Sequence, residues 1–208
     1  MTIQDIYNQF QSNLLFNSSP KFLKLRNKLL DEYDLTPKIK RNNESLKHLD
    51  PNVLNFSYKY NKPSNAISKL DNNSKEINID VINGSVQKIL KNDNRNSDII
   101  IENINSKNNI IEDKFLNFQN YFNKDYILNL NSLLTNCGYQ ILIKENQSAN
   151  IFISNNLTDK DITIFQKNLI TCSKNSKILI IEEIITDVES NNNSVNFIDL
   201  QEGAEVTH

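Results

Sequence analysis

Glycine is scarce in this chain of 208 residues, which contains only Gly84, Gly138 and Gly203. Three isolated glycines cannot build a phosphate-binding P-loop or a dinucleotide-binding fingerprint, so we do not expect the chain to hydrolyse ATP. Histidine is rarer still: His48 and His208 are far apart, and no histidine, cysteine and carboxylate residues cluster along the sequence. A metal site built by this chain alone is therefore not expected.

Cysteine is limited to Cys137 and Cys172, which lie 35 positions apart. This spacing fits neither a C-x-x-C redox pair nor a zinc-binding motif. We interpret both residues as reduced, mostly buried thiols that contribute to packing.

An excess of charge of one sign is also missing, because 23 basic residues stand against 25 acidic ones. Such a balance gives no electrostatic footprint for nucleic acid. No apolar run approaches the ~20 residues that span a bilayer, and residues 1–5 resemble neither a signal peptide nor an Arg-rich transit peptide. We therefore expect a cytoplasmic protein without nucleic-acid or membrane partners.

Asparagine, by contrast, is abundant, as in residues 72–73, 155–156 and 191–193. The asparagines are dispersed between apolar segments, which argues against a disordered low-complexity tract. We interpret them as a composition bias in which asparagine fills turns, where it tolerates a positive φ.

The first 136 residues predict a helical domain. A helix is expected over residues 3–15, and a second begins at Ser19-Pro20, a cap followed by a first-turn proline, and ends before Thr36-Pro37. Residues 41–78 read as a polar surface segment. The apolar stripe expected to pack the second helix into the core comprises Phe22, Leu25, Leu29 and Tyr33.

A small strand pair is expected near residues 77–103 of this domain. Residues 77–82 lead into Asn83-Gly84, a strong hairpin signal, and residues 98–101 form another short strand. Two helices follow at about 112–123 and 124–136, with Gly138 as the C-cap of the second.

The remaining residues, 137–208, read as short strands separated by turns. A motif recurs there in which two apolar residues two positions apart are followed, three residues later, by a residue that tolerates left-handed φ. Successive copies start 29 and 28 positions apart. The three copies are Ile141-Ile143-Asn146, Ile170-Cys172-Asn175 and Ile198-Leu200-Gly203.

A fixed period of strand, turn and strand is typical of a solenoid whose coils bury their apolar faces against one another. We predict an α+β, mainly β, protein in which a helical domain precedes the first coils of a parallel β-helix. In this arrangement Cys172 points into the core. A β-sandwich or barrel with regularly spaced strands is the alternative.

The order of these pieces resembles the SufB/SufD family of iron–sulfur cluster assembly scaffolds, closest to SufD. The resemblance covers the helix and strand before and after Gly138, two later coils, and the closing His208. Weaker matches are the entry segment at residues 36–47 and the strands at 79–86. The matching coil segments are residues 126–134, 138–143, 166–170, 175–183 and 197–208.

The resemblance implies a non-catalytic scaffold subunit whose partners are a SufB-type paralogue and a SufC-type ATPase. It implies that the chain itself binds no cofactor and that the iron–sulfur cluster belongs to the assembled complex. Members of the family are longer, so the residues that assemble clusters and contact partners are expected beyond His208. No catalytic, cofactor-binding or metal-binding residue is therefore assigned, and His208 is given a structural role.

Two other functions fit a β-solenoid. A generic protein-interaction module without an iron–sulfur role stays open. An enzyme built on a β-helix, such as a polysaccharide lyase, would show charged residues clustered on one face of several coils together with a secretory signal, and neither is present. The carboxylates of Glu182 and Glu183 alternate between strand faces and cannot act together as a general acid and base.

Overall fold

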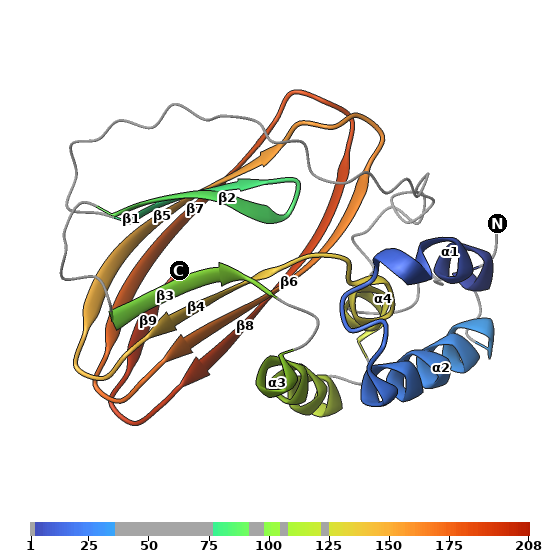
Figure 1. Ribbon diagram of the computed structural model, residues 1–208, viewed down its shortest axis with the longest axis horizontal. Helices are drawn as coiled ribbons and strands as arrows, with labels where there is room; N and C mark the ends of the chain where they lie inside the picture. Colours follow the sequence, from blue (N-terminus) through green and yellow to red (C-terminus); the bar gives the residue numbers. More distant parts are fainter. Residues whose placement is uncertain (1–2, 36–76, 92–97, 105–107, 122–124) are drawn as a thin grey trace, which may run out of the picture.

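The computed structural model describes residues 3–35, 77–91, 98–104, 108–121 and 125–208 (Figure 1). Its helices are α1 (Ile3–Phe10), α2 (Pro20–Leu35), α3 (Asn109–Tyr121) and α4 (Tyr126–Leu134), with a 3-10 turn η1 (Gln11–Asn13) after α1. Its strands are β1 (Ile77–Ile82), β2 (Ser85–Lys91), β3 (Ile99–Asn103), β4 (Tyr139–Ile143), β5 (Ser148–Leu157), β6 (Thr163–Cys172), β7 (Lys177–Thr186), β8 (Asn191–Leu200) and β9 (Glu205–Thr207). The predicted entry segment at 36–47 and nearly all of the polar segment 41–78 lie outside the described residues, as does His48.

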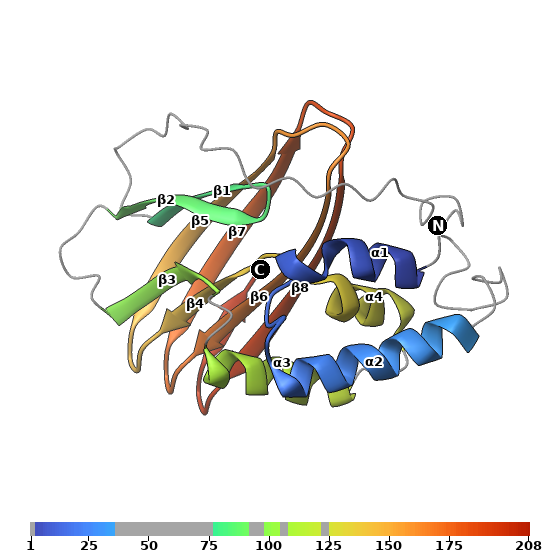
Figure 2. The same ribbon diagram turned by 45° about the vertical axis from the view of Figure 1, so that its right-hand side comes forward.

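The strands form two sheets that face each other, with the helices gathered at one side (Figure 2). Sheet A has the order β2-β1-β5-β7-β9 and sheet B the order β3-β4-β6-β8. Only β1–β2 and β3–β4 pair in antiparallel fashion, and every other pair is parallel. The fold is therefore α+β with two mostly parallel sheets.

From β4 onward the chain alternates between the two sheets, with β4, β6 and β8 in sheet B and β5, β7 and β9 in sheet A. The three copies of the sequence motif are paired in register. Ile141 lies opposite Ile170, which lies opposite Ile198, and the next inward positions align Ile143 with Cys172 and Cys172 with Leu200. The predicted side-by-side alignment of the copies is confirmed.

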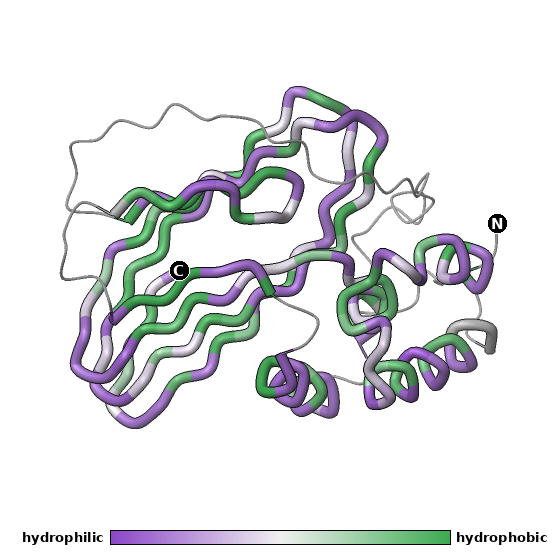
Figure 3. Tube along the Cα trace, in the orientation of Figure 1, coloured by the Kyte–Doolittle hydropathy of each residue, from purple (hydrophilic) through white to green (hydrophobic). Residues whose placement is uncertain are grey.

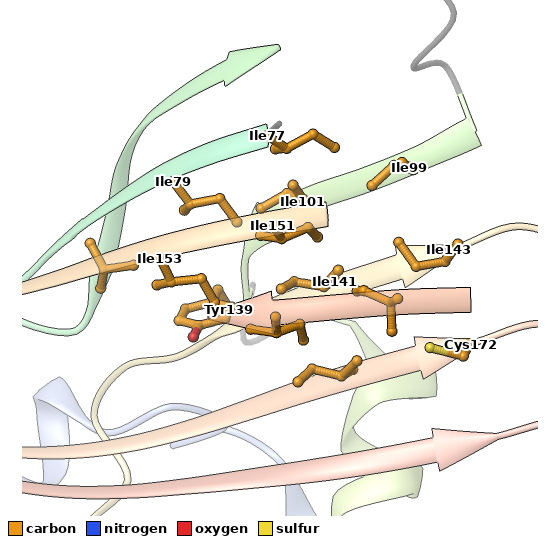
Figure 4. Packing of buried hydrophobic residues seen from close by; sticks show 14 residues of the cluster. Ile77, Ile79, Ile99, Ile101, Tyr139, Ile141, Ile143, Ile151, Ile153 and Cys172 are labelled. Carbon is orange, nitrogen blue, oxygen red and sulfur yellow. The ribbon is translucent and has the colours of Figure 1, made fainter. Parts of the chain in front are cut away.

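The core between the sheets consists mainly of isoleucine side chains from both sheets (Figure 4). Figure 3 shows the strands alternating between hydrophobic and hydrophilic residues, which places one side chain in two in this layer. Ile141, Ile143 and Ile79 are fully buried. Burying each such side chain contributes about 1.5–3 kcal/mol, so the aliphatic layer is the main stabilising feature of the two sheets.

The turns carry left-handed residues where the motif predicts them. Asn146, Asn175 and Gly203 have φ values of 59°, 55° and 71°. The amide of Asn175 donates a 3.3 Å hydrogen bond to Oδ1 of Asn146, so neighbouring turns also contact each other. The predicted hairpin is confirmed as well, with positive φ at both Asn83 and Gly84.

Asparagine is not confined to turns, as the composition suggested. Residues 191–193 begin β8, and residues 155–156 lie near the end of β5. The interpretation was wrong there because parallel pairing with β6 and β7 decides these segments, and pairing overrides the weak strand preference of asparagine.

The helices match their predicted positions closely. The Ser19 hydroxyl accepts a 3.2 Å hydrogen bond from the backbone N–H of Phe22, which confirms the cap of α2. Phe22 and Leu29 are buried in the helical layer and Leu25 packs beside them, so this stripe serves the core. The side chain of Tyr33 lies outside the described residues. The first helix is shorter than predicted, since it gives way to η1 after Phe10.

The strands expected as a small pair near 77–103 join the sheets of the later residues. β1 lies parallel to β5 in sheet A, and β3 lies antiparallel to β4 in sheet B. Residues from the first part of the chain therefore cover one end of the stack formed by residues 137–208.

Gly138 does not cap α4, which corrects the prediction. The C-cap is Thr135. Gly138 instead lies just before β4, where its backbone comes close to the backbone of β6. A Cβ atom at Gly138 would lie 1.9 Å from the backbone oxygen of Lys167. The glycine is needed because it leaves room for the β6 backbone.

We expect Gly138→Ala to lower the free energy of unfolding by about 3 kcal/mol, because the new methyl group meets rigid backbone. Gly203→Ala is the comparison: its Cβ would meet the side-chain oxygen of Asn175, which can move, and its left-handed φ costs about 1–2 kcal/mol. Urea denaturation of both variants measures the difference. A smaller loss for Gly138→Ala than for Gly203→Ala would contradict the close-approach explanation.

Candidate functional site

A group of polar side chains lies between the two sheets, next to the aliphatic core. They arise because polar residues occupy positions two apart from the inward isoleucines: Asn168 precedes Ile170, and Glu182 follows Ile180. We call this group the interior polar cluster. Its members are Asn155, Gln166, Asn168, Glu182, Asn196 and His208.

Hydrogen bonds connect the cluster across both sheets. The Asn155 amide donates to Gln166 Oε1 and to Glu182 Oε1, each at 3.4 Å. Gln166 donates to Asn168 Oδ1 at 3.1 Å, and Asn168 donates to Asn196 Oδ1 at 2.8 Å. Asn155, Gln166 and Asn168 are completely buried, so these bonds replace the water that the amides have lost.

Glu182 and His208 form the ionisable end of the cluster. Nε2 of His208 lies 3.3 Å from Oε2 of Glu182, and the two side chains are 30% and 12% exposed. Burial, together with the charge of Glu182, raises the pKa of the neighbouring Tyr139 phenol, which therefore stays neutral. Oδ1 of Asn155 is buried without a hydrogen-bond partner.

This geometry has limited chemistry of its own. A carboxylate and an imidazole could ligate a metal ion, but no group of three histidine, cysteine or acidic side chains is present among the described residues. The neighbours of the pair are amides and the neutral phenol of Tyr139, and none of them is a ready nucleophile. The cluster can fix the register of β5, β6, β7 and β8 through directional bonds.

The sequence predicted a structural role for His208, and its contact with Glu182 fits that role. Glu182 and Glu183 do lie on opposite faces: Glu182 points inward and is mostly covered, whereas Glu183 is exposed. Cys137 and Cys172 are both free and buried, as predicted, and burial raises the pKa of each thiol, so neither is a ready nucleophile.

A buried lysine on the opposite face of sheet B was not predicted. Lys167 is 1% exposed, and its ammonium donates a 2.5 Å hydrogen bond to the hydroxyl of Ser132 on α4. The rings of Phe115 and Phe197 each lie 5.6 Å from Nζ. Burial, aided by the charge of Arg26, lowers the pKa of Lys167 to about 7.

The Lys167 site continues into the helices. Ser132 donates to Gln119 on α3, and Gln119 donates a 2.5 Å hydrogen bond to Asn129. A serine next to a lysine of lowered pKa occurs in some nucleophilic enzymes. Here Ser132 is completely buried as well, so no substrate can reach either group. The pair instead connects α3 and α4 to sheet B.

Asparagine 131 makes a second connection of this kind. The Asn131 amide donates to the backbone oxygens of Gln166 at 3.0 Å and of Asn193 at 2.9 Å. One helical side chain therefore holds two neighbouring strands of sheet B.

Comparison with known proteins gives no relative: no family model, curated protein or solved structure matches the chain. In the part of the chain that the structure describes, none of the helices has the length and apolar character needed to cross a membrane.

We expect Asn168→Ala to lower the free energy of unfolding by about 2–4 kcal/mol, because three partners lose their bonds inside the core. These partners are the Tyr139 N–H, the Gln166 amide and Asn196 Oδ1. Asn150→Ala, at an exposed position of β5, should change stability by less than about 0.5 kcal/mol. Equal effects in urea denaturation would mean that the interior polar cluster adds no stability.

Lys167 should make stability depend on pH. Between pH about 7 and the ordinary lysine pKa of 10.5, the unfolded chain holds a proton that the folded chain has lost. The free energy of unfolding should therefore rise with pH in this window, by up to about 1.4 kcal/mol per pH unit, and this gain is absent below pH 7.

Lys167→Met should remove that rise, and Lys144→Met, at an exposed turn, should retain it. Urea denaturation between pH 6.5 and 9 measures the slope for both variants and the parent chain. Parallel pH profiles for Lys167→Met and the parent would show that Lys167 keeps its proton when folded.

Proposed function

We propose that residues 137–208 form the first coils of a parallel β-helix, and that the chain is a SufD-like, non-catalytic scaffold subunit of an iron–sulfur cluster assembly complex. The single observation that carries the proposal is the in-register pairing of Ile141, Ile170 and Ile198 on successive parallel strands. Strands that alternate between two sheets while stacking every 28 or 29 residues are what a two-sided coil produces.

The positions of the resembling segments support the scaffold assignment. Residues 126–134 coincide with α4, residues 166–170 lie in β6, residues 175–183 cover a turn and most of β7, and residues 197–208 run from β8 through a turn into β9. The family resemblance therefore falls on consecutive structural units in the expected order.

A scaffold without catalysis also fits the interior. Isoleucine side chains and hydrogen-bonded amides fill the space between the sheets, so a substrate finds no room there. In this proposal the chain works in the cytoplasm beside a SufB-type paralogue and a SufC-type ATPase, and the cluster is held by the complex. If those partners do not bind, the alternative function, a generic protein-interaction module without an iron–sulfur role, is the one that remains.

We expect the immobilised full-length gene product to capture both SufB-type and SufC-type proteins at physiological ionic strength of about 0.15 M. Ile170→Asp places a charge in the buried stack and should abolish capture, whereas Ile110→Asp, 74% exposed on α3, should bind like the parent. Circular dichroism of each variant reports whether the strands persist.

Failure of the full-length gene product to capture either partner would remove the iron–sulfur role. Capture that survives in Ile170→Asp after its strand signal is lost would show that binding does not depend on the proposed coils.

A further inference from the structure

Two positively charged side chains are buried together where the helices meet sheet B. Lys167 extends from β6 and is 1% exposed, and Arg26 of α2 is completely buried. The Arg26 guanidinium donates to the backbone oxygens of Leu133 at 3.1 Å and Leu15 at 2.7 Å, and its Nη1 has no hydrogen-bond partner. The charge of Arg26 disfavours the protonated form of Lys167, so each cation destabilises the other.

The groups that face Lys167 from the surrounding elements are not acidic. Nζ donates to the Ser132 hydroxyl of α4, and the rings of Phe115 on α3 and Phe197 on β8 lie on either contact side at 5.6 Å. The phenol of Tyr7 on α1 acts electrostatically on Arg26. Among the described residues, Lys167 therefore has no carboxylate to balance its charge.

The acidic groups of the neighbouring elements are bound elsewhere. Glu112 of α3 is 5% exposed and accepts a hydrogen bond from the Ser19 hydroxyl at the start of α2. Asp199 of β8 pairs with Lys114 of α3, with Nζ and Oδ2 2.7 Å apart. These contacts hold α2, α3 and β8 together without reaching Lys167.

The helices pack in a layer that is separate from the aliphatic core. The core between the two sheets contains side chains of strands only. The helices instead contact the outer face of sheet B (Figure 2), which contributes the buried side chains of Phe165, Leu169 and Phe197. Because sheet B separates the two apolar layers, the helices could move away while the aliphatic core stays packed.

We propose that the contact of α3 and α4 with sheet B is pH-sensitive: when Lys167 binds a proton, the two helices separate from the sheet while the sheets stay packed against each other. Separation returns water to the ammonium group and increases its distance from Arg26. The two aromatic rings attract the charged form, but lost hydration is the larger effect in a buried site. The separated state exposes Phe165 and Leu169 on the outer face of sheet B.

The direction of the pH effect follows from the two states of Lys167. Burial, aided by Arg26, lowers its pKa to about 7 in the packed state, whereas a lysine in water has a pKa of 10.5. The separated state therefore binds the proton more tightly, and separation becomes easier as pH falls from 10.5 to 7. Between about pH 8.5 and about pH 6 the equilibrium constant for separation should rise about thirtyfold.

Hydrogen–deuterium exchange of the full 208-residue chain, followed by mass spectrometry, tests the proposal. After correction for the intrinsic pH dependence of exchange, the amides of α3 and α4 should lose protection about thirtyfold from about pH 8.5 to about pH 6. At about pH 6, β5 should stay at least about tenfold more protected than these helices, because its inward Ile151 and Ile153 belong to the aliphatic core.

A matched pair of lysine variants assigns the effect. Lys167→Met has a side chain of similar length that cannot bind a proton, so the protection of α3 and α4 should agree within about twofold at the two pH values. Lys144→Met, at an exposed turn, should keep the change of about thirtyfold. The comparison of the parent chain at two pH values needs no substitution and holds whether or not Lys167→Met folds.

Equal protection of α3, α4 and β5 at about pH 6 would overturn the proposal, because the chain would then open as one unit. Protection of the parent helices that does not change with pH would overturn it as well. An unchanged pH response in folded Lys167→Met would assign the titration to another group. The inference uses only the burial and charge of this contact, so none of these outcomes depends on the proposed scaffold function.

Discussion

In-register stacking of inward aliphatic side chains is the interaction on which the rest of the structure depends. Ile141, Ile170 and Ile198 lie side by side on three parallel strands, and each strand can bury its inward face only against its neighbours and the facing sheet. A shift of one residue would turn every inward side chain outward, so burial fixes the register. The left-handed residues Asn146 and Asn175 then set where each strand ends, and the turns stack as the strands do.

Hydrogen bonds between polar side chains add directional contacts to this apolar layer. Inside, the amides of Asn155, Gln166 and Asn168 bond across the two sheets. Outside, Lys167 reaches Ser132 between two aromatic rings and joins the helices to sheet B. Among the described residues Lys167 forms no ion pair with a carboxylate, so burial destabilises its charged form and lowers its pKa. Directional bonds of this kind specify one arrangement where aliphatic packing alone would tolerate several.

The candidate site was visible in the sequence only in part. The inward position of Cys172 and the separation of Glu182 from Glu183 followed from strand alternation, because that period is a local property. The interior polar cluster did not follow, because Gln166 and Asn168 interrupt an apolar alternation and resemble outward residues. Lys167 was missed because, as a lysine in a strand, it resembles an exposed residue. It lies on the face of sheet B that α4 covers, and that contact is made by Ser132, 35 positions away in the sequence.

The sequence by itself determined the repeat, the turn residues that adopt left-handed φ, the Asn-Gly hairpin and the cap of α2, since each depends on the conformational preferences of a few neighbouring residues. Only the tertiary structure decided that β1 and β3 join separate sheets, that Gly138 makes room for the β6 backbone, and that asparagines at 191–193 begin β8. Those features depend on surfaces brought together from distant segments, and no local preference encodes which surfaces will meet.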